Sequence, residues 1–230
     1  MNTVSSHYKE LLDFLYNCHS FADFLEYGTE DSFMDWQYGL PKLSFEINWG
    51  SSKGVIFDPD LPYVLKIPFD FYTSRARNYC EIEYENYQAA KDFPEILDRF
   101  AWIDFLFTYK GYPIYIMEKV DCDDEEILSR AFNSSYSTYC ERNNFLSKKE
   151  KLKDFSDLFH CHYSPREQMN DLLINQIGAA RTELFWDFCE AREINDLHCG
   201  NWGLRENDLV LVDYSGYFGN HNSSYSSSFS

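Results

Sequence analysis

The feature that most constrains the fold is a change in sequence pattern near residue 120. Up to that point the chain carries short β-like runs interrupted by turn residues, with a helical segment over 73–92. Beyond it the apolar spacing becomes helical, most clearly from Ser164 to about Arg192, where Pro165 suits the first turn. The pattern therefore predicts a strand-rich first lobe and a helical second lobe. The expected strands of the first lobe are LSFEINW (43–49), GVIFD (54–58), YVLKIPF (63–69) and two strands within 102–120.

The pattern divides the chain into four regions. They are an N-terminal helical extension (1–40), the strand-rich lobe (41–120), the helical lobe with the polar loops (121–216) and a polar, Ser-rich tail (217–230). A final strand is expected at 208–214. We find no internal repeat of the length that solenoid proteins use.

Composition narrows the class of protein. The length of 230 residues, 44% of them hydrophobic, suits one medium-sized domain or two small lobes. The 38 acidic residues outnumber the 20 basic ones, and the formal net charge is −18. Such a surface repels phosphate backbones and anionic lipid, so we expect neither nucleic-acid nor membrane binding by charge, while a basic partner protein stays open. No long apolar run and no signal-peptide core occur, so we expect a cytoplasmic protein.

The seven cysteines are scattered and include no Cys-x-x-Cys pair, so we expect reduced thiols. A zinc site around His160, Cys161 and His162, joined by His198 and Cys199, is one alternative. Zinc ligands usually come in pairs spaced to close on one ion, and no second pair is present. A polar helix end is the simpler interpretation of 160–162.

The strongest chemical signal is Asp196-Leu-His-Cys-Gly-Asn201, followed by Asp213 after a short hairpin. Two carboxylates and an amide at these spacings suit phosphoryl transfer. Asp196 would orient or deprotonate an acceptor hydroxyl, and Asn201 and Asp213 would hold Mg²⁺, which prefers hard oxygen ligands. We expect His198 to fix the loop by a hydrogen bond. These residue types also favour turns and caps, which explains their composition but not the spacing to Asp213.

A lysine upstream fits the same chemistry. Lys66 lies in the apolar run Tyr-Val-Leu-Lys-Ile-Pro, where a buried lysine is costly without an anionic partner. The helical segment that follows offers Glu81, Glu83 and Glu85 as that partner.

Together these segments resemble the protein-kinase fold. The resemblance implies an α+β, two-lobed fold with a small antiparallel-sheet N-lobe and a reduced, mostly helical C-lobe. It also implies ATP and Mg²⁺ as cofactors. In VLKI, Lys66 is similar to the third-strand lysine that contacts the α- and β-phosphates, and Glu83 best matches its glutamate partner, with Glu85 second. In IYIMEKV, Met117 is similar to the gatekeeper, and the backbone from Glu118 to Val120 would meet adenine.

The resemblance extends to the C-terminal loops. Asp196 corresponds to the catalytic aspartate, and Asn201 and Asp213 correspond to the metal ligands. The glycine loop would be Gly50-Ser51-Ser52-Lys-Gly54, with two glycines where kinases have three.

Several departures narrow the resemblance. Ile194-Asn195 stands where His-Arg is usual, which argues against control by activation-loop phosphorylation. Only 17 residues follow Asp213. In this short C-terminal segment the chain resembles compact bacterial and phage serine/threonine kinases, and the resemblance implies a location in the bacterial or host cytoplasm. His198 is similar to the Asp-x-His-x-x-Asn loop of aminoglycoside and choline kinases.

The resemblance implies a phosphotransferase that moves the γ-phosphate of ATP to a hydroxyl, with a protein Ser or Thr as the first expectation. Two alternatives remain. One is a small-molecule acceptor. The other is a pseudokinase or an acidic interaction or inhibitor protein that occupies a basic partner.

Overall fold

The computed structural model describes residues 46–49, 53–57, 61–68, 78–109, 112–143 and 147–216. The expected N-terminal extension and polar tail lie outside the described residues. So do Gly50, Ser51 and Ser52 of the expected glycine loop.

The first lobe is a five-stranded antiparallel sheet in the order β1-β2-β3-β5-β4. Its strands are β1 (Glu46–Trp49), β2 (Lys53–Phe57), β3 (Tyr63–Pro68), β4 (Ile103–Tyr109) and β5 (Tyr112–Glu118). The central strand β3 is rich in branched residues, and Leu65 and Ile67 are fully buried. Lys66 lies between them, opposite Val55 of β2 and Tyr115 of β5, so it points to the other face of the sheet.

One helix, α4 (Tyr79–Ala90), packs against β3 and β4 of this sheet. Its first turn is capped by Asn78, whose side chain accepts a hydrogen bond from the Glu81 amide. Its buried residues are Cys80, Glu83, Asn86 and Ala90, which recur at helical spacing. The buried face of α4 therefore carries a carboxylate and an amide, and both need partners there.

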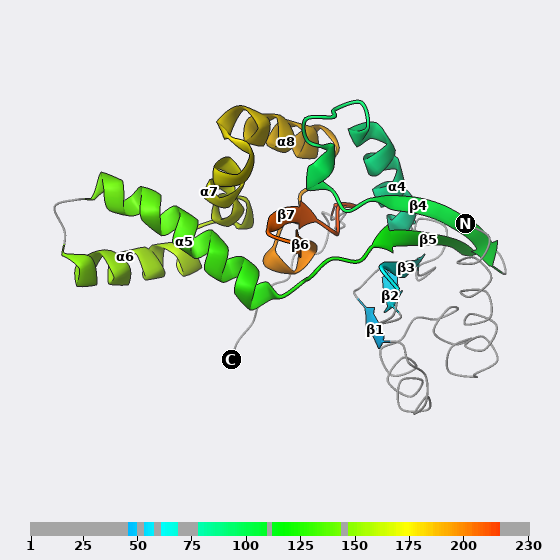
Figure 1. Ribbon diagram of the computed structural model, residues 1–230, viewed down its shortest axis with the longest axis horizontal. Helices are drawn as coiled ribbons and strands as arrows, with labels where there is room; N and C mark the ends of the chain where they lie inside the picture. The colour runs from blue at the N-terminus through cyan, green and yellow to red at the C-terminus, as the bar shows by residue number, and fades with distance from the viewer. Residues whose placement is uncertain are drawn as a thin grey trace, which may run out of the picture.

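The second lobe contains four helices within the described ranges: α5 (Asp124–Arg142), α6 (Lys148–Cys161), α7 (Pro165–Ile177) and α8 (Ala179–Ala191). In Figure 1, α5 and α6 form a hairpin that extends away from the sheet, and α7 and α8 lie beside the β6–β7 hairpin introduced below. Ser164 and Glu167 cap α7 reciprocally, with Pro165 at its first position.

The single helix expected over 164–192 is wrong, because the chain breaks into α7 and α8 at Gly178. This glycine has φ +81° and ψ 159°, a conformation that side-chain-bearing residues rarely adopt. Its amide donates to Ile174 O, closing α7, and its carbonyl accepts from Thr182 N, opening α8. The apolar spacing continues on both sides, so periodicity alone does not reveal the break.

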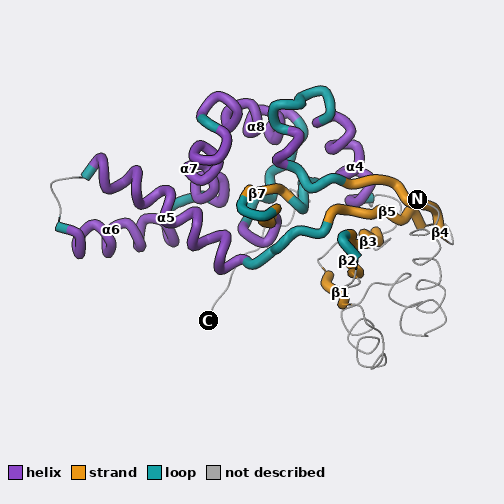
Figure 2. Tube along the Cα trace, in the orientation of Figure 1, coloured by secondary structure: helices purple, strands orange, loops and turns teal. Residues whose placement is uncertain are grey.

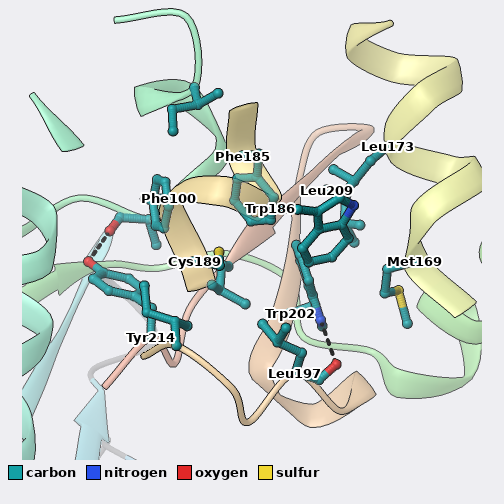
Figure 3. Close-up of a cluster of buried hydrophobic side chains, with 14 of the residues drawn as sticks. Phe100, Met169, Leu173, Phe185, Trp186, Cys189, Leu197, Trp202, Leu209 and Tyr214 are labelled. Atoms are coloured by element: carbon teal, nitrogen blue, oxygen red, sulfur yellow. Dashed lines mark hydrogen bonds between the residues drawn. The ribbon is translucent and has the colours of Figure 1, made fainter. Parts of the chain in front are cut away.

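A short helix, η1 (Leu97–Arg99), lies between α4 and β4 in the chain. After α8 come a second short helix, η2 (Cys199–Asn201), and the hairpin of β6 (Trp202–Arg205) and β7 (Asp208–Leu211). The strand expected at 208–214 thus ends at Leu211. Trp202 and Tyr214, on either side of β7, are fully buried. They join an aromatic core with Phe100 and Phe185 (Figure 3).

The predicted α+β class is confirmed. The antiparallel sheet comes first, the mostly helical part follows, and the order and pairing of the elements are consistent with a kinase-like fold. Figure 2 shows the two parts joined by the chain that leaves β5 and enters α5. Among the described residues, no helix is long and apolar enough to cross a membrane.

Candidate active site

A cavity of about 580 Å³ lies between the sheet and the C-terminal segment. Of the expected site residues, Lys66, Met117, Glu118, Val120, Asp196, Asn201 and Asp213 line it. Glu83 lies behind the cavity wall and reaches it through Lys66. Gly54 sits in β2, opposite Ile67 of β3, and does not line the cavity. The structure therefore gathers residues from separate parts of the chain around one space.

Lys66 and Glu83 form a buried ion pair. The Lys66 ammonium lies 3.0 and 2.9 Å from the two carboxylate oxygens of Glu83 and donates a third bond to Val212 O at 2.7 Å. Glu81 and Glu85 are exposed on the other side of α4. Burial raises the pKa of Glu83 despite the nearby lysines, so its charge depends on their contacts.

A second lysine, Lys53 on β2, enters the same cluster. Its ammonium lies 2.6 Å from Glu83 Oε1, 2.6 Å from Asp213 Oδ1 and 3.4 Å from Ser215 Oγ. Its side chain is only 7% exposed. Burial lowers the pKa of Lys53, but Glu83 and Asp213 outweigh burial and raise it, so the lysine is charged at neutral pH.

The sequence reasoning missed Lys53, because it placed this residue in the glycine loop and began the strand at residue 54. A signal was present in the strand period. Val55 lies opposite Lys66, and a residue two positions earlier points to the same face. Finding it requires the register between β2 and β3, which the sequence alone does not provide.

Hydrogen bonds to the backbone and to the carboxylate hold Asp213 in place. The amides of Val212 and Asp213 donate to Asn201 O at 2.9 and 3.3 Å, which ties the Asp213 segment to the loop of Asp196. Ser215 Oγ donates to Asp213 Oδ1 at 3.0 Å. Burial acts to raise the pKa of Asp213, but the lysine charges and the Lys53 hydrogen bond hold that pKa well below its usual range.

Side-chain hydrogen bonds shape the loop of Asp196. Asn201 Nδ2 donates to Asp196 O at 2.6 Å, and Trp202 Nε1 donates to Leu197 O at 3.1 Å. His198 Nδ1 accepts from the Gly200 amide at 3.1 Å, and its Nε2 lies 3.7 Å from Asp196 Oδ1. The Asp196 carboxylate is 43% exposed at the cavity, so an incoming hydroxyl can approach it.

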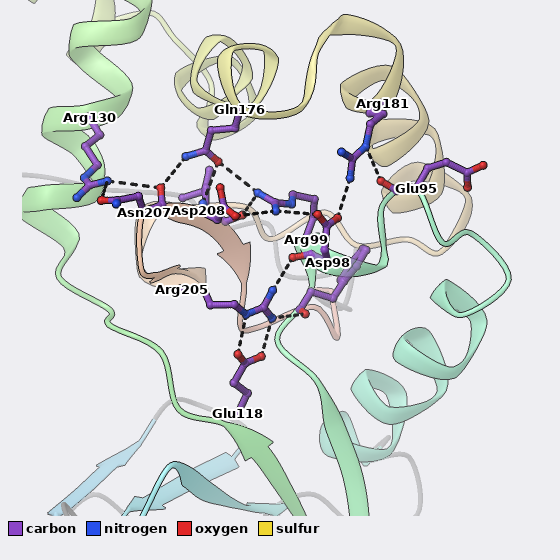
Figure 4. A network of polar contacts seen from close by, with 12 residues as sticks. Glu95, Asp98, Arg99, Glu118, Arg130, Gln176, Arg181, Arg205, Asn207 and Asp208 are labelled. Carbon is purple, nitrogen blue, oxygen red and sulfur yellow. Dashed lines mark hydrogen bonds and ion pairs between the residues drawn. The ribbon is translucent and has the colours of Figure 1, made fainter.

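The expected hinge is tied to the C-terminal hairpin. Arg205 of β6 donates two hydrogen bonds of 2.6 Å to the carboxylate of Glu118. Figure 4 shows this ion pair within a wider network of arginines and acidic residues. The amides of Glu118 and Lys119 donate to Trp102 O and Pro62 O, at 2.9 and 3.1 Å. Within the described residues no bond occupies the Val120 amide, so it is the hinge amide that a ligand base could use.

The donor set at the cavity suits a hard divalent cation. Because Asn201 Nδ2 is bonded to Asp196 O, the amide oxygen is the group that could ligate a metal, next to the Asp213 carboxylate. Mg²⁺ typically takes few protein oxygens and completes its shell with water and phosphate. Among the described residues, no group of three or more His, Cys, Asp or Glu side chains could hold a metal. The zinc alternative at His160, Cys161 and His162 therefore finds no support in the described structure.

Comparison with solved structures finds a distant similarity. The structure is similar to a crystal structure of an aminoglycoside phosphotransferase from Alicyclobacillus acidocaldarius subsp. acidocaldarius, with 15% identity and a TM-score of 0.31. The match covers 77% of this chain and 64% of that one. No family model matches the sequence, and no curated protein matches it.

Proposed function

We propose that this protein is an ATP- and Mg²⁺-dependent phosphotransferase that transfers the γ-phosphate to a hydroxyl. The observation that carries the proposal is the grouping of the Lys66–Glu83 pair, Asp196, Asn201 and Asp213 around one cavity. Each alone has a plain structural interpretation, but a cation, a partly exposed carboxylate and two oxygen ligands facing one space meet the needs of phosphoryl transfer.

The chain's own groups divide the work in this proposal. Lys66 binds phosphate oxygens, and Glu83 holds its ammonium in place. Asp196 accepts the proton of the acceptor hydroxyl as the new oxygen–phosphorus bond forms and the bond to the β-phosphate oxygen breaks, which releases ADP. Asn201 and Asp213 hold Mg²⁺, which neutralises charge on the phosphates. Met117 and the chain from Glu118 to Val120 border the space for adenine.

The charge around the cavity favours a cationic acceptor. Asp121, Asp123 and Asp124 are exposed where the chain enters α5. The Asp124 carboxylate lies close to Gly200 of the catalytic loop, 3.7 Å from where a Cβ atom would stand. These carboxylates do not line the cavity, but they lie beside its lining residues Val120, Cys122 and Gly200, and together with the net charge of −18 they attract positive charge and repel acids. We propose a Ser or Thr hydroxyl in a basic protein segment as acceptor, acting in the cytoplasm without nucleic acid or membrane. An amine-bearing small alcohol is the second candidate.

Transfer of labelled γ-phosphate from Mg·ATP tests the proposal. A basic Ser/Thr peptide, an acidic peptide of matched length and an aminated sugar serve as acceptors. Asp196→Asn keeps the side-chain volume and should lower the rate by roughly 10²–10⁴, the contribution of a positioned base. Glu190→Gln, on the exposed side of α8, is the matched control and should leave the rate unchanged. Equal rates in the Asp196→Asn and control variants would refute the assigned role.

A non-catalytic function is favoured by a different observation, the excess of acidic residues. In that alternative the acidic surface occupies a basic protein, and the complex weakens steeply as salt rises. Absence of phosphate transfer to every acceptor, together with salt-sensitive capture of a purified basic protein, would support this alternative over the phosphotransferase.

A further inference from the structure

Lys53 brings a second cation to a site where Lys66 already occupies the position expected of a phosphate-binding lysine. The Lys53 and Lys66 ammonium groups share Glu83, and Lys53 also contacts Asp213. Two lysines and two carboxylates thus form a closed cluster whose formal charges cancel. Three of the four charged side chains are buried and Asp213 is 30% exposed; burying charges is costly unless each is paired, and here each of them is.

We propose that Lys53 is a resident counter-ion of Asp213 which a divalent metal displaces, and that the displaced ammonium then contacts nucleotide phosphate. This inference rests on the proposed function, because it concerns how the same site admits a metal and a nucleotide. It gives Lys53 a role that neither the sequence pattern nor the Lys66–Glu83 pair requires.

The contacts of Asp213 support competition between the two cations. Asp213 Oδ1 accepts from both the Lys53 ammonium and Ser215 Oγ, so the oxygen that faces Lys53 is already engaged. A metal that ligates this carboxylate brings a positive charge within a few ångströms of the ammonium, and such like charges repel strongly in a partly buried site. A metal on this carboxylate therefore weakens its contact with Lys53 and favours the departure of one of the two cations.

The contacts of Glu83 show which cation can leave. When Lys53 moves away, Glu83 keeps both bonds to Lys66, at 3.0 and 2.9 Å. Lys66 is further anchored to a backbone carbonyl, Val212 O, whereas the contacts of Lys53 within the described residues are to side chains, two ion pairs of 2.6 Å and a 3.4 Å bond to Ser215 Oγ. The flexible four-carbon stem of a lysine lets its ammonium move without a change in the backbone. When Lys53 leaves, the buried carboxylate of Glu83 therefore keeps Lys66 as its ion-pair partner.

The position of Lys53 in the chain points to where its ammonium goes. Lys53 lies at the start of β2, directly before Gly54, on the face of the sheet that borders the cavity. The segment before it has fewer glycines than a kinase phosphate loop, and hence less scope for close backbone contacts to phosphate. An added ammonium at this end of β2 compensates for those contacts by charge.

Metal binding without nucleotide tests the competition directly. Free Mn²⁺ in titrations of the purified protein is measured by electron paramagnetic resonance for wild type, Lys53→Met, Lys66→Met and Lys91→Met. Lys53→Met should bind Mn²⁺ at least about ten-fold more tightly, because the competing charge is gone. Lys66→Met, which leaves the Lys53–Asp213 contact intact, should gain clearly less, and Lys91→Met, at the exposed C-cap position that follows α4, should match wild type. Equal gains in Lys53→Met and Lys66→Met, or no gain in either, would overturn the inference.

Nucleotide binding tests the second half. Calorimetric titration with the Mg²⁺ complex of a non-hydrolysable ATP analogue measures two effects of Lys53→Met together, the gain in metal affinity and the loss of the phosphate contact. The affinity for the complex should therefore fall about ten-fold below the value that the Mn²⁺ gain alone would give, and adenosine affinity should be unchanged. Lys53→Gln should reproduce both results, and circular dichroism of each variant verifies folding. If wild type binds the analogue and Lys53→Met gains as much affinity for its Mg²⁺ complex as for free Mn²⁺, this inference fails while the proposed function stands. If wild type binds no analogue, the proposed function fails, and the Mn²⁺ titration alone decides whether Lys53 is the counter-ion of Asp213.

Discussion

Asn86 joins α4 to the C-terminal lobe, so its replacement should loosen the contact between the two lobes. The side chain is 1% exposed. Its Nδ2 donates to Tyr214 O at 2.7 Å, and its Oδ1 accepts from Arg192 Nε at 2.8 Å. Asn86→Ala removes both bonds and leaves a buried carbonyl and a guanidinium N–H without their partner.

The magnitude follows from these two bonds. A neutral hydrogen bond contributes roughly 1 kcal/mol and one to a charged group roughly 1.5–3 kcal/mol, so Asn86→Ala should cost about 2–4 kcal/mol. For a chain of this size that corresponds to a decrease in melting temperature of about 5–15 °C. Asn86→Asp keeps the acceptor for Arg192 but cannot donate to Tyr214 O, and its loss should be dominated by that single contact.

The assay is urea unfolding followed by tryptophan fluorescence, with Gln88→Ala as the control on the same helix. Gln88 only accepts from the exposed Lys91 ammonium, so its loss should change stability by less than about 0.5 kcal/mol. If Asn86→Ala unfolds at the same urea concentration as Gln88→Ala, then α4 is not held to the second lobe through this amide, and the reasoning is wrong.

Three further predictions concern other parts of the chain. Arg205→Met should cost about 2–3 kcal/mol in urea unfolding, because the partly buried Glu118 loses both bonds, and the double variant Arg205→Met/Glu118→Met should recover part of that loss. Gly178→Ala should cost about 1–3 kcal/mol through backbone strain at φ +81°, since a Cβ there has open space, and an unchanged urea midpoint would contradict this. Asp98→Asn tests pH dependence. The arginines next to Asp98 outweigh burial and lower its pKa below 3.8, so its contribution to stability is present above that pH and is lost as pH falls through the folded-state pKa. Wild type should therefore lose stability on acidification more steeply than Asp98→Asn, and parallel unfolding curves in acid would contradict the assignment.

The sequence predicts the order of the elements well because periodicity reflects burial directly. Strands β1, β3, β4 and β5 and helix α4 lie within the expected segments, and β2 begins one residue before its expected start. The break at Gly178 was missed for a physical reason: a helix tolerates a glycine at modest cost, and only tertiary packing decides whether that glycine takes a positive φ.

The sequence likewise predicts only part of the candidate site. Spacing within a loop and its hairpin is a local property, and it identified Asp196, Asn201 and Asp213 as candidates that the structure shows around one cavity. Their roles stay predictions until transfer is measured. Lys53 could not be found in this way, because its contacts to Asp213 join residues 160 positions apart. The Arg205–Glu118 clamp likewise depends on how the two lobes meet.

The contacts on either side of Asp213 determine how much must change when a ligand binds. Lys66 and Asn86 donate to the two carbonyls that flank Asp213, so the sheet and α4 are both fastened to the same short segment. Glu83 is therefore held against Lys66 by packing and hydrogen bonds within the chain, without any phosphorylated residue. In kinases the corresponding pair has to be in place before transfer, and its position is often controlled. In this structure the Lys66–Glu83 pair is formed, and in our proposal the contact that changes on ligand binding is the one between Lys53 and Asp213. In that proposal, control of the site acts through the metal, which competes with Lys53 for Asp213, and through the nucleotide, which binds the displaced ammonium.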